Sequence, residues 1–435
     1  MKLRSLVFSL LLLSSLTKSA YSQERLTLKQ AVEIALQNNF DIKLSSNNVD
    51  IAKTNVSRGL SAMLPTVAGN FNRSNGLQNI TQTRGGTTEK KNWAKNSNMS
   101  YGPIVNWQIF DGFGMFARYD QLKEFQKLGE TTLQLTVQNT LTNVITNYYD
   151  LVQQQQQIRS LQTALEISRI RLKNSKSRYE IGKAAKLEVL AATVDLNTDT
   201  TNLLRQRDTY RNTKIRLNEL LSRTLDTEFS VADTIIIQNN LKLAELQNTA
   251  STQNPTIQSA IINQRIANLN LKQVRSDRYP TVSVSTGYNF NKSTSQLGFA
   301  TLSQSNGLNY GVSASINIFS GFLQKKNERI ASIEVMNSAL QVQKTNLNIS
   351  SQIASFYQTY TTNLELVNLE EQNLNVAKQN LDITLEKFRL GSVAPLEFRE
   401  AQRNYINASA RYSNAQFEAK LAEISLKQLT GSIKL

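Results

Sequence analysis

Two hydrophobic patterns with different periods alternate along the 435-residue chain. One is a seven-residue spacing of apolar residues, typical of helices that pack side by side as in a coiled coil. It predicts a long helix over residues 114–178, roughly 100 Å in length, and a matching helix in the second half. The ladders are Val137, Val144, Leu151, Ile158, Leu165, Leu172 and Tyr179, and Ile353, Tyr360, Val367, Leu374, Leu381 and Phe388.

The other pattern alternates apolar with small or polar residues. It is clearest in Val282, Val284, Tyr288 and Phe290, and in Leu308, Tyr310, Val312, Ala314, Ile316 and Ile318. The first half repeats it less cleanly in Val67 and Phe71, and in Met99, Tyr101, Val105, Trp107 and Ile109. Such segments of about ten residues suit the strands of a membrane barrel.

A soluble antiparallel sheet with one buried face would alternate in the same way. Lipid is favoured because the strands are few and no helix of matching apolar character remains to cover them. Pro103 weakens the strand prediction around it, since proline donates no ladder hydrogen bond. The polar segments 74–97 and 294–306 are expected to be exposed tips.

Each strand pair is preceded by a proline that should end a helix. We expect one helix over 26–63 before Leu64-Pro65 and another from about 241 before Tyr279-Pro280. Pro65 and Pro280 therefore mark helix–strand junctions, as do Gly112 in Phe110-Asp111-Gly112 and Gly321 in Phe319-Ser320-Gly321.

The two halves share one plan at an offset of 209 residues, which separates Gly112 from Gly321 and Gly182 from Gly391. Gly182 and Gly391 are expected to end the long helices as left-handed caps. Return helices should follow over 187–223 and 395–430, where Pro395 is tolerated in a first turn. We expect repeats at 23–223 and 241–435, joined by a linker, 224–240, that contains a short strand or docking segment.

The N-terminus reads as a secretory signal over residues 1–22, with basic residues, an apolar run and the small-x-small site Ala20-Tyr21-Ser22. Its removal lowers the formal net charge from +16 to +13, because it carries three basic residues and no acid. For such an exported basic chain, anionic lipid or lipopolysaccharide is a better neighbour than nucleic acid.

The chain contains no Cys and no His. Thiol nucleophiles, disulfides, Cys/His zinc sites and the usual general base are therefore excluded. We expect no enzymatic activity, no cofactor and no metal. An exported carboxylate hydrolase is a remote alternative, because the acids are scattered along helices.

The duplicated order of helix, proline, two strands, Phe-x-Gly, long helix, (Tyr/Phe)-x-x-Gly, Leu-Glu and return helix resembles the TolC-like outer membrane efflux protein family over essentially the whole mature chain. The resemblance implies a mainly helical homotrimer with membrane β-structure. Long antiparallel hairpins would form a trimeric α-barrel tunnel, continued by a twelve-stranded barrel with four strands from each chain. Four strands alone could not close a barrel in lipid.

The resemblance also implies an entrance at the hairpin tips, constricted by acidic residues. Glu397 and Glu400 match that pattern, with Glu188 as the first-repeat counterpart. An acid in a first helical turn is also common because it favours the helix dipole. For Glu397, a role in the pore and a role at the helix terminus are weighed equally. For Glu400 the pore is favoured, and for Glu188 the helix terminus.

Some family members lock the entrance with a basic residue where this chain has Val393 and Ala394. Its basic tip residues, Lys183 and Lys186, lie in the first repeat instead. A contact between Lys186 and Glu397 is a hypothesis.

The function implied is a passive exit duct of a tripartite efflux or type I secretion system. Its partners would be an inner-membrane pump and a periplasmic adaptor, also called a membrane fusion protein. The alternative is a periplasmic coiled-coil adaptor or scaffold, which would share the signal and hairpins but lack paired amphipathic strands. The exported substrates are open.

Overall fold

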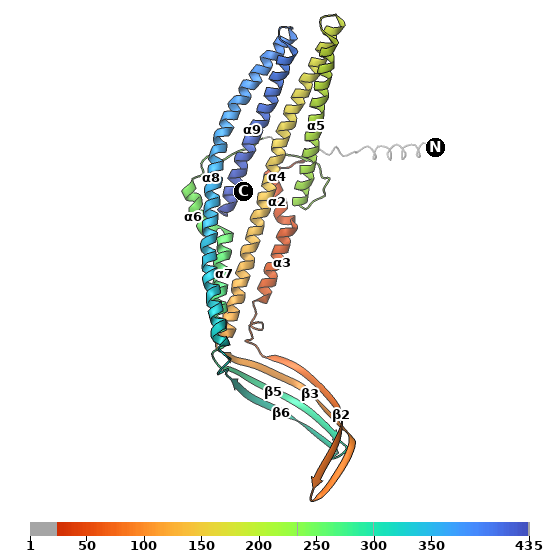
Figure 1. Cartoon of the computed structure of the whole chain (residues 1–435), viewed down its shortest axis with the longest axis vertical. Helices are drawn as coiled ribbons and strands as arrows, with labels where there is room; N and C mark the ends of the chain where they lie inside the picture. The colour runs from red at the N-terminus through yellow and green to blue at the C-terminus, as the bar shows by residue number, and fades with distance from the viewer. Residues whose placement is uncertain (1–23, 233, 299, 434–435) are drawn as a thin grey trace, which may run out of the picture. The chain divides into compact units, whose positions relative to one another are not determined.

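The computed structural model describes residues 24–232, 234–298 and 300–433, so the signal expected at 1–22 lies outside the described residues. The elements, drawn in Figure 1, are β1 (Glu24–Arg25), α2 (Leu28–Asn38), α3 (Phe40–Asn55), β2 (Thr66–Arg84), β3 (Thr87–Asp111), α4 (Gly114–Glu180), α5 (Lys186–Leu220), β4 (Phe229–Ser230), α6 (Leu243–Gln253), α7 (Pro255–Ser276), β5 (Thr281–Ser295), β6 (Leu302–Ser315), α8 (Leu323–Arg389) and α9 (Pro395–Leu429). The chain divides into two compact units, to both of which α3, α4 and α8 contribute.

The first unit comprises the described parts of Met1–Ser45, Gln134–Pro255 and Asn346–Leu435. It contains two helical hairpins, in which α5 returns after α4 and α9 returns after α8 (Figure 1). The long helices α4 and α8 each have 67 residues, and the return helices α5 and α9 each have 35. The predicted long and return helices are confirmed.

The linker between the repeats docks on the core of this unit. Its strand β4 pairs in parallel with β1, and Phe229, Val231 and Ile235 are buried beside Leu151 and Leu217. The hydroxyl of Tyr148 donates to Leu26 O at 3.0 Å and accepts from the Ala232 amide at 3.1 Å. Burial raises the pKa of Tyr148, which keeps this hydroxyl neutral. The sequence offered Val231 and residues 235–237 as a short strand or a docking segment: Val231 and Ile235 dock on this core, whereas the strand is Phe229–Ser230.

The helix predicted over 26–63 is wrong in its middle and at its end. Asn39 breaks it, because its side-chain oxygen accepts from the Asp41 and Ile42 amides and so caps α3. Its side-chain amide donates to Leu220 O at 3.0 Å. Residues 56–63 form turns in which Ser57 Oγ accepts from the Leu60 amide, a local bond that competes with the helix.

The helical stretch expected from about residue 241 is broken in the equivalent way. Asn254 separates α6 from α7, and Pro255 follows it. The Asn254 side-chain amide donates to Leu429 O at 2.8 Å, which is the second-repeat counterpart of the Asn39 bond to Leu220. Both breaks therefore tie a short helix to the last turn of a return helix.

The second unit comprises Ser46–Leu133 and the described part of Thr256–Thr345. Its four-stranded sheet has the order β2-β3-β5-β6, antiparallel throughout (Figure 1). The β3–β5 ladder interrupts its pairing at Pro103. Gly102 beside it is required sterically, because a Cβ there would meet Tyr288 O at 2.0 Å.

The register places the apolar positions of all four strands on one face of the sheet. Directly paired residues share a face, and the pairs include Val67 with Val105, Trp107 with Val284, and Val284 with Val312. The opposite face carries Asn70, Asn106, Ser283, Ser285, Asn289, Ser313 and Ser315. The predicted alternation is confirmed.

The apolar face is exposed, with Tyr310 at 84% and Val312 at 72%. No helix in the described part of the chain is both long and apolar enough to cross a membrane.

The segment 74–97 is mostly exposed, as expected, but the prediction that it is a loop is wrong. Residues 74–84 and 87–97 belong to β2 and β3, which pair almost to their ends. The turn is only Gly85-Gly86, with φ of 53° and 84°, as a two-residue hairpin requires. The sequence has no apolar alternation in these segments, and the two polar strands are held together by backbone hydrogen bonds instead. The tip expected over 294–306 is shorter, since β5 reaches Ser295 and β6 begins at Leu302; β6 also ends before Ile316 and Ile318.

Candidate functional site

The two hairpin tips have the same backbone. At the first, Gly182 has φ 73° and its amide donates to Tyr179 O, while the Lys183 amide donates to Arg178 O. At the second, Gly391 has φ 75°, and the amides of Gly391 and Ser392 donate to Phe388 and Lys387. This is the Schellman arrangement. A Cβ on either glycine would meet no atom within 4 Å, so conformation alone requires glycine.

The return helices begin without a side-chain cap. Ala185 and Ala394 occupy the N-cap positions of α5 and α9, and Pro395 lies in the first turn of α9. Each first turn contains one acid, Glu188 or Glu397. The helix dipole therefore favours a negative charge at both positions.

Glu188 is engaged within its own hairpin. It accepts from Ser175 Oγ at 3.0 Å and lies 3.7 Å from the Arg178 guanidinium. Its side chain is 16% exposed. Its charge is thus offset by α4.

Glu397 and Glu400 are exposed on α9. Three residues apart, they are neighbours on the helix surface. Among the described residues their carboxylates have no ion-pair or hydrogen-bond partner, and Lys186 forms no ion pair with Glu397. Lys183 and Lys186 are exposed at the first tip. The second tip therefore presents two uncompensated carboxylates, and the first presents two cations.

The sequence reasoning missed a polar cluster between the two hairpins. Arg399 on α9 donates to Asp199 Oδ2 at 2.8 Å and lies 3.4 Å from Asp195. Arg171 on α4 also pairs with Asp195. Burial acts to lower the pKa of Arg399, but hydrogen bonding to Asp199 and the charges of both aspartates outweigh it, so the pKa is raised.

Further hydrogen bonds satisfy the polar atoms of this cluster. Asp199 accepts from Ser168 Oγ, and the Gln402 side-chain amide donates to Ser168 Oγ at 2.9 Å and to Ala164 O at 2.7 Å. A signal was present in the sequence, because the duplication fails here: the counterparts of Arg399 and Asp199 at the 209-residue offset are Leu190 and Ala408.

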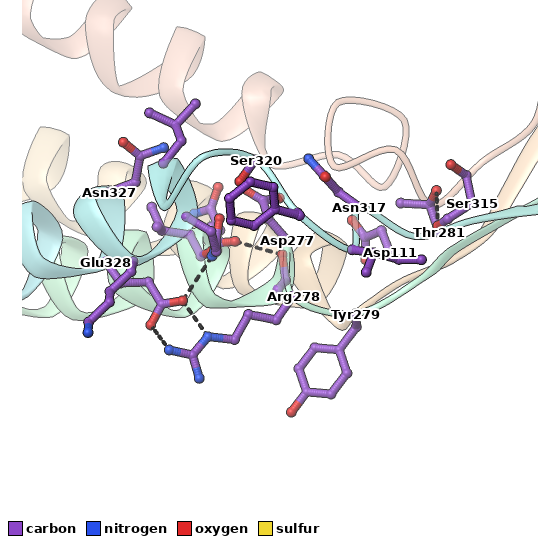
Figure 2. Close-up of a pocket in the computed structure, with 18 of the residues that line it drawn as sticks. Asp111, Asp277, Arg278, Tyr279, Thr281, Ser315, Asn317, Ser320, Asn327 and Glu328 are labelled. Atoms are coloured by element: carbon purple, nitrogen blue, oxygen red, sulfur yellow. Dashed lines mark hydrogen bonds and ion pairs between the residues drawn. The ribbon is translucent and has the colours of Figure 1, made fainter.

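Neighbours of Gly112, Pro280 and Gly321 line a cavity of about 1010 Å³ in the second unit (Figure 2); Pro65 and its neighbours do not. Arg278 forms a two-pronged ion pair with Glu328. This hydrogen bond raises the pKa of Arg278 and lowers the pKa of Glu328. Asp111 Oδ1 accepts from the Met115 amide at 3.0 Å and so caps α4. At this junction Arg278 and Glu328 thus neutralise each other, and the Asp111 carboxylate binds the backbone of α4.

The junction glycines are not equivalent. Gly112 has φ 68°, and a Cβ on it would meet Ser276 O at 2.3 Å, so both conformation and the close approach of α7 require it. Gly321 has φ 61° but open space around it. Pro65 lies just before β2, and Pro280 between α7 and β5. Among the described residues, no three acids gather into a group that could hold a metal.

Long helical hairpins and a sheet with one exposed apolar face are the features expected of an outer membrane channel. The sequence matches the family described as outer membrane efflux protein over residues 31–223 and 246–432. These two segments make up most of the chain, which therefore belongs to the outer membrane efflux protein family.

The relatives agree. The chain is 19% identical to outer membrane protein TolC of Escherichia coli (strain K12), over 93% of this chain and 82% of that protein. It is 21% identical to outer membrane efflux protein BepC of Brucella suis biovar 1, over 98% and 90% respectively. The crystal structure of the Campylobacter jejuni CmeC outer membrane channel superposes with a TM-score of 0.80 at 18% identity, covering 93% of this chain and 85% of that one.

Fold class, family and function agree with the expectations from sequence. The protein is an outer membrane efflux channel with a periplasmic helical tunnel, and the trimer with its twelve-stranded barrel follows from the family. A periplasmic adaptor or scaffold is not favoured.

Proposed function

We propose that three copies of this chain assemble into a passive exit duct. The observation that carries the proposal is a sheet with an exposed apolar face and two edge strands, β2 and β6. Hydrocarbon tolerates no open edge. Because β2 and β6 run in opposite directions, β6 of one copy can pair antiparallel with β2 of the next. Three copies then close a barrel of twelve strands.

The duct performs no chemistry of its own in this proposal. An inner-membrane pump and a periplasmic adaptor deliver the substrate, and the repeats at 23–223 and 241–435 form the wall, with the 224–240 linker in its girdle. The pairing of Arg278 with Glu328, and of Arg399 with Asp199, supports this view. In this proposal those charges stabilise the wall.

Adjacent residues on β6 test which face contacts lipid. Val312 lies on the apolar face and Ser313 on the polar face. Val312→Lys places a charge in lipid, at about 2–4 kcal/mol for a position near the midplane, and we expect loss of the heat-modifiable trimer. Ser313→Lys should assemble and alter single-channel conductance. Equal assembly of both variants would contradict the barrel.

The entrance is proposed to lie at the second-repeat tip. Glu397 and Glu400 are exposed and uncompensated, so three copies would gather six carboxylates around the axis and attract cations. Glu188 is assigned to the contact between α5 and α4, because Arg178 offsets its charge.

The adaptor is proposed to dock on the tips through paired leucines. Leu187 and Leu396, related by the 209-residue offset, are 75% and 78% exposed. Grouped exposed apolar side chains mark protein interaction surfaces, and Ile181 and Leu390 are also exposed at these tips, at 65% and 82%. Leu187→Ser with Leu396→Ser should raise drug sensitivity while trimer and conductance persist. Unchanged sensitivity at normal expression would remove this surface from the proposal.

A further inference from the structure

Two rows of side chains cross the sheet near the end of its apolar face. Phe71 of β2 pairs with Tyr101 of β3, which pairs with Phe290 of β5. Two residues further from the helices, Arg73 pairs with Met99, which pairs with Lys292. Because the side-chain period of a strand is two, both rows lie on the apolar face.

The first row is an aromatic platform. The rings of Tyr101 and Phe290 stack at 4.9 Å, and Tyr288 meets Phe290 edge-on at 5.1 Å. The side-chain amide of Asn306 donates to the Tyr288 hydroxyl at 3.0 Å. Aromatic residues with a polar tip favour the boundary between hydrocarbon and headgroups.

The second row supplies cations at the level where headgroups begin. Arg73 and Lys292 are exposed, and among the described residues neither side chain has an acidic partner. Lys95, paired with Leu77, adds a third cation on the same face. Strands lie about 4.8 Å apart, so Arg73 and Lys292, separated by one strand, are close enough to act on one headgroup.

The depth of the row fits an interface. From Val282 to Phe290 the apolar face of β5 spans nine residues, and a tilted membrane strand needs about 9–11. Lys292 therefore lies just past the hydrocarbon. The helices adjoin the opposite end of the strands, so this end faces the outside.

We propose that Arg73 and Lys292, above the aromatic platform, bind the phosphate groups of lipopolysaccharide in the outer leaflet. This inference rests on the proposed function, because it takes the apolar face as the lipid face. The uncompensated cations supply the charge complementarity, and the platform supports the first segments of the acyl chains. The site would fasten the barrel to its surrounding lipid.

The test uses the purified, delipidated full-length trimer titrated with lipid A, with lipid A whose phosphates have been removed, and with phosphatidylglycerol, and read by native mass spectrometry. We expect lipid A to bind best. R73Q with K292Q should weaken lipid A binding roughly 10- to 30-fold. R73K with K292R should retain it, because both charges remain.

The matched control is K90Q with K91Q, which removes two cations from the part of the β2–β3 hairpin beyond the bulge near Gln78 and Ile80. It should stay within about twofold of wild type. Equal binding by R73Q/K292Q and wild type, an equal loss in the control, or equal binding of phosphatidylglycerol and lipid A would each overturn the proposal.

Conductance separates the two proposals. If R73Q/K292Q forms trimers with wild-type single-channel conductance and wild-type lipid A binding, the lipid site fails and the duct stands. If neither the wild type nor any variant forms a conducting trimer, the proposed exit-duct function is wrong.

Discussion

The two hairpin tips share a backbone but differ in charge. Gly182 and Gly391 form the same cap with the same hydrogen bonds, and each return helix starts with one acid. At the first tip Arg178 offsets the acid, whereas at the second Glu397 and Glu400 have no partner among the described residues. Duplication thus preserved the conformation, and divergence of a few side chains distinguished a supporting hairpin from one that presents carboxylates.

The same asymmetry fastens the hairpins together. The first hairpin supplies Asp195 and Asp199, and the second supplies Arg399. The ion pair is not repeated, because Leu190 and Ala408, the counterparts of Arg399 and Asp199 at the 209-residue offset, carry no charge.

The largest expected effect comes from Arg399→Met. Asp199, whose side chain is 4% exposed, would lose its cation, and breaking such a buried pair destabilises by about 3–5 kcal/mol. Denaturant unfolding of the trimer measures this change. Arg389→Met is the matched control: its ion pair with Glu386 is exposed, so the change should be below about 1 kcal/mol. Similar values for both variants would contradict the buried clamp.

A smaller and equal effect is expected from Gly182→Ala and Gly391→Ala. Both positions need a left-handed conformation, which costs an L-residue about 1–2 kcal/mol. Because the surroundings are open in both cases, the two losses of unfolding free energy should agree closely. A loss confined to one tip would show that the caps are not equivalent.

The smallest stability effects are expected at the acids, where ion selectivity separates the tips. Glu188→Gln should reduce the free energy of unfolding by less than about 1 kcal/mol and leave the reversal potential in a salt gradient unchanged. Glu397→Gln with Glu400→Gln should leave stability unchanged and shift the reversal potential toward lower cation preference. If Glu188→Gln shifted the reversal potential and the double variant did not, the entrance acids would lie at the first tip instead.

Local patterns predicted the parts of the fold that local physics determines. The alternation at Val282 and Val284 identified a strand face, and Gly182 and Gly391 located the helix ends. The breaks at Asn39 and Asn254 were missed although local signals are present: Asn39 caps α3 through the Asp41 and Ile42 amides, and Pro255 follows Asn254. Hidden from the sequence is the distant carbonyl that each side-chain amide meets, Leu220 O or Leu429 O. No residue inside a helix pattern reveals such a partner.

Two other features were not predicted from the sequence because they depend on pairing between distant residues. The polar outer half of the β2–β3 hairpin has no apolar alternation, so only its ladder identifies it as strand. The contact of Arg399 with Asp199 joins residues 200 positions apart. The acids Glu397 and Glu400 were found by resemblance, and their role at the entrance remains a prediction.

The most direct test of the central claim, that second-repeat carboxylates of three copies converge on the axis, uses the absence of cysteine from the chain. Glu400→Cys and Glu188→Cys each introduce a single thiol, and a short bismaleimide is applied to outer membranes containing either variant. We predict covalent dimers with Glu400→Cys, since one thiol per chain can join only two chains, and monomers alone with Glu188→Cys. Crosslinked oligomers only with Glu188→Cys, or with neither variant, would contradict the account.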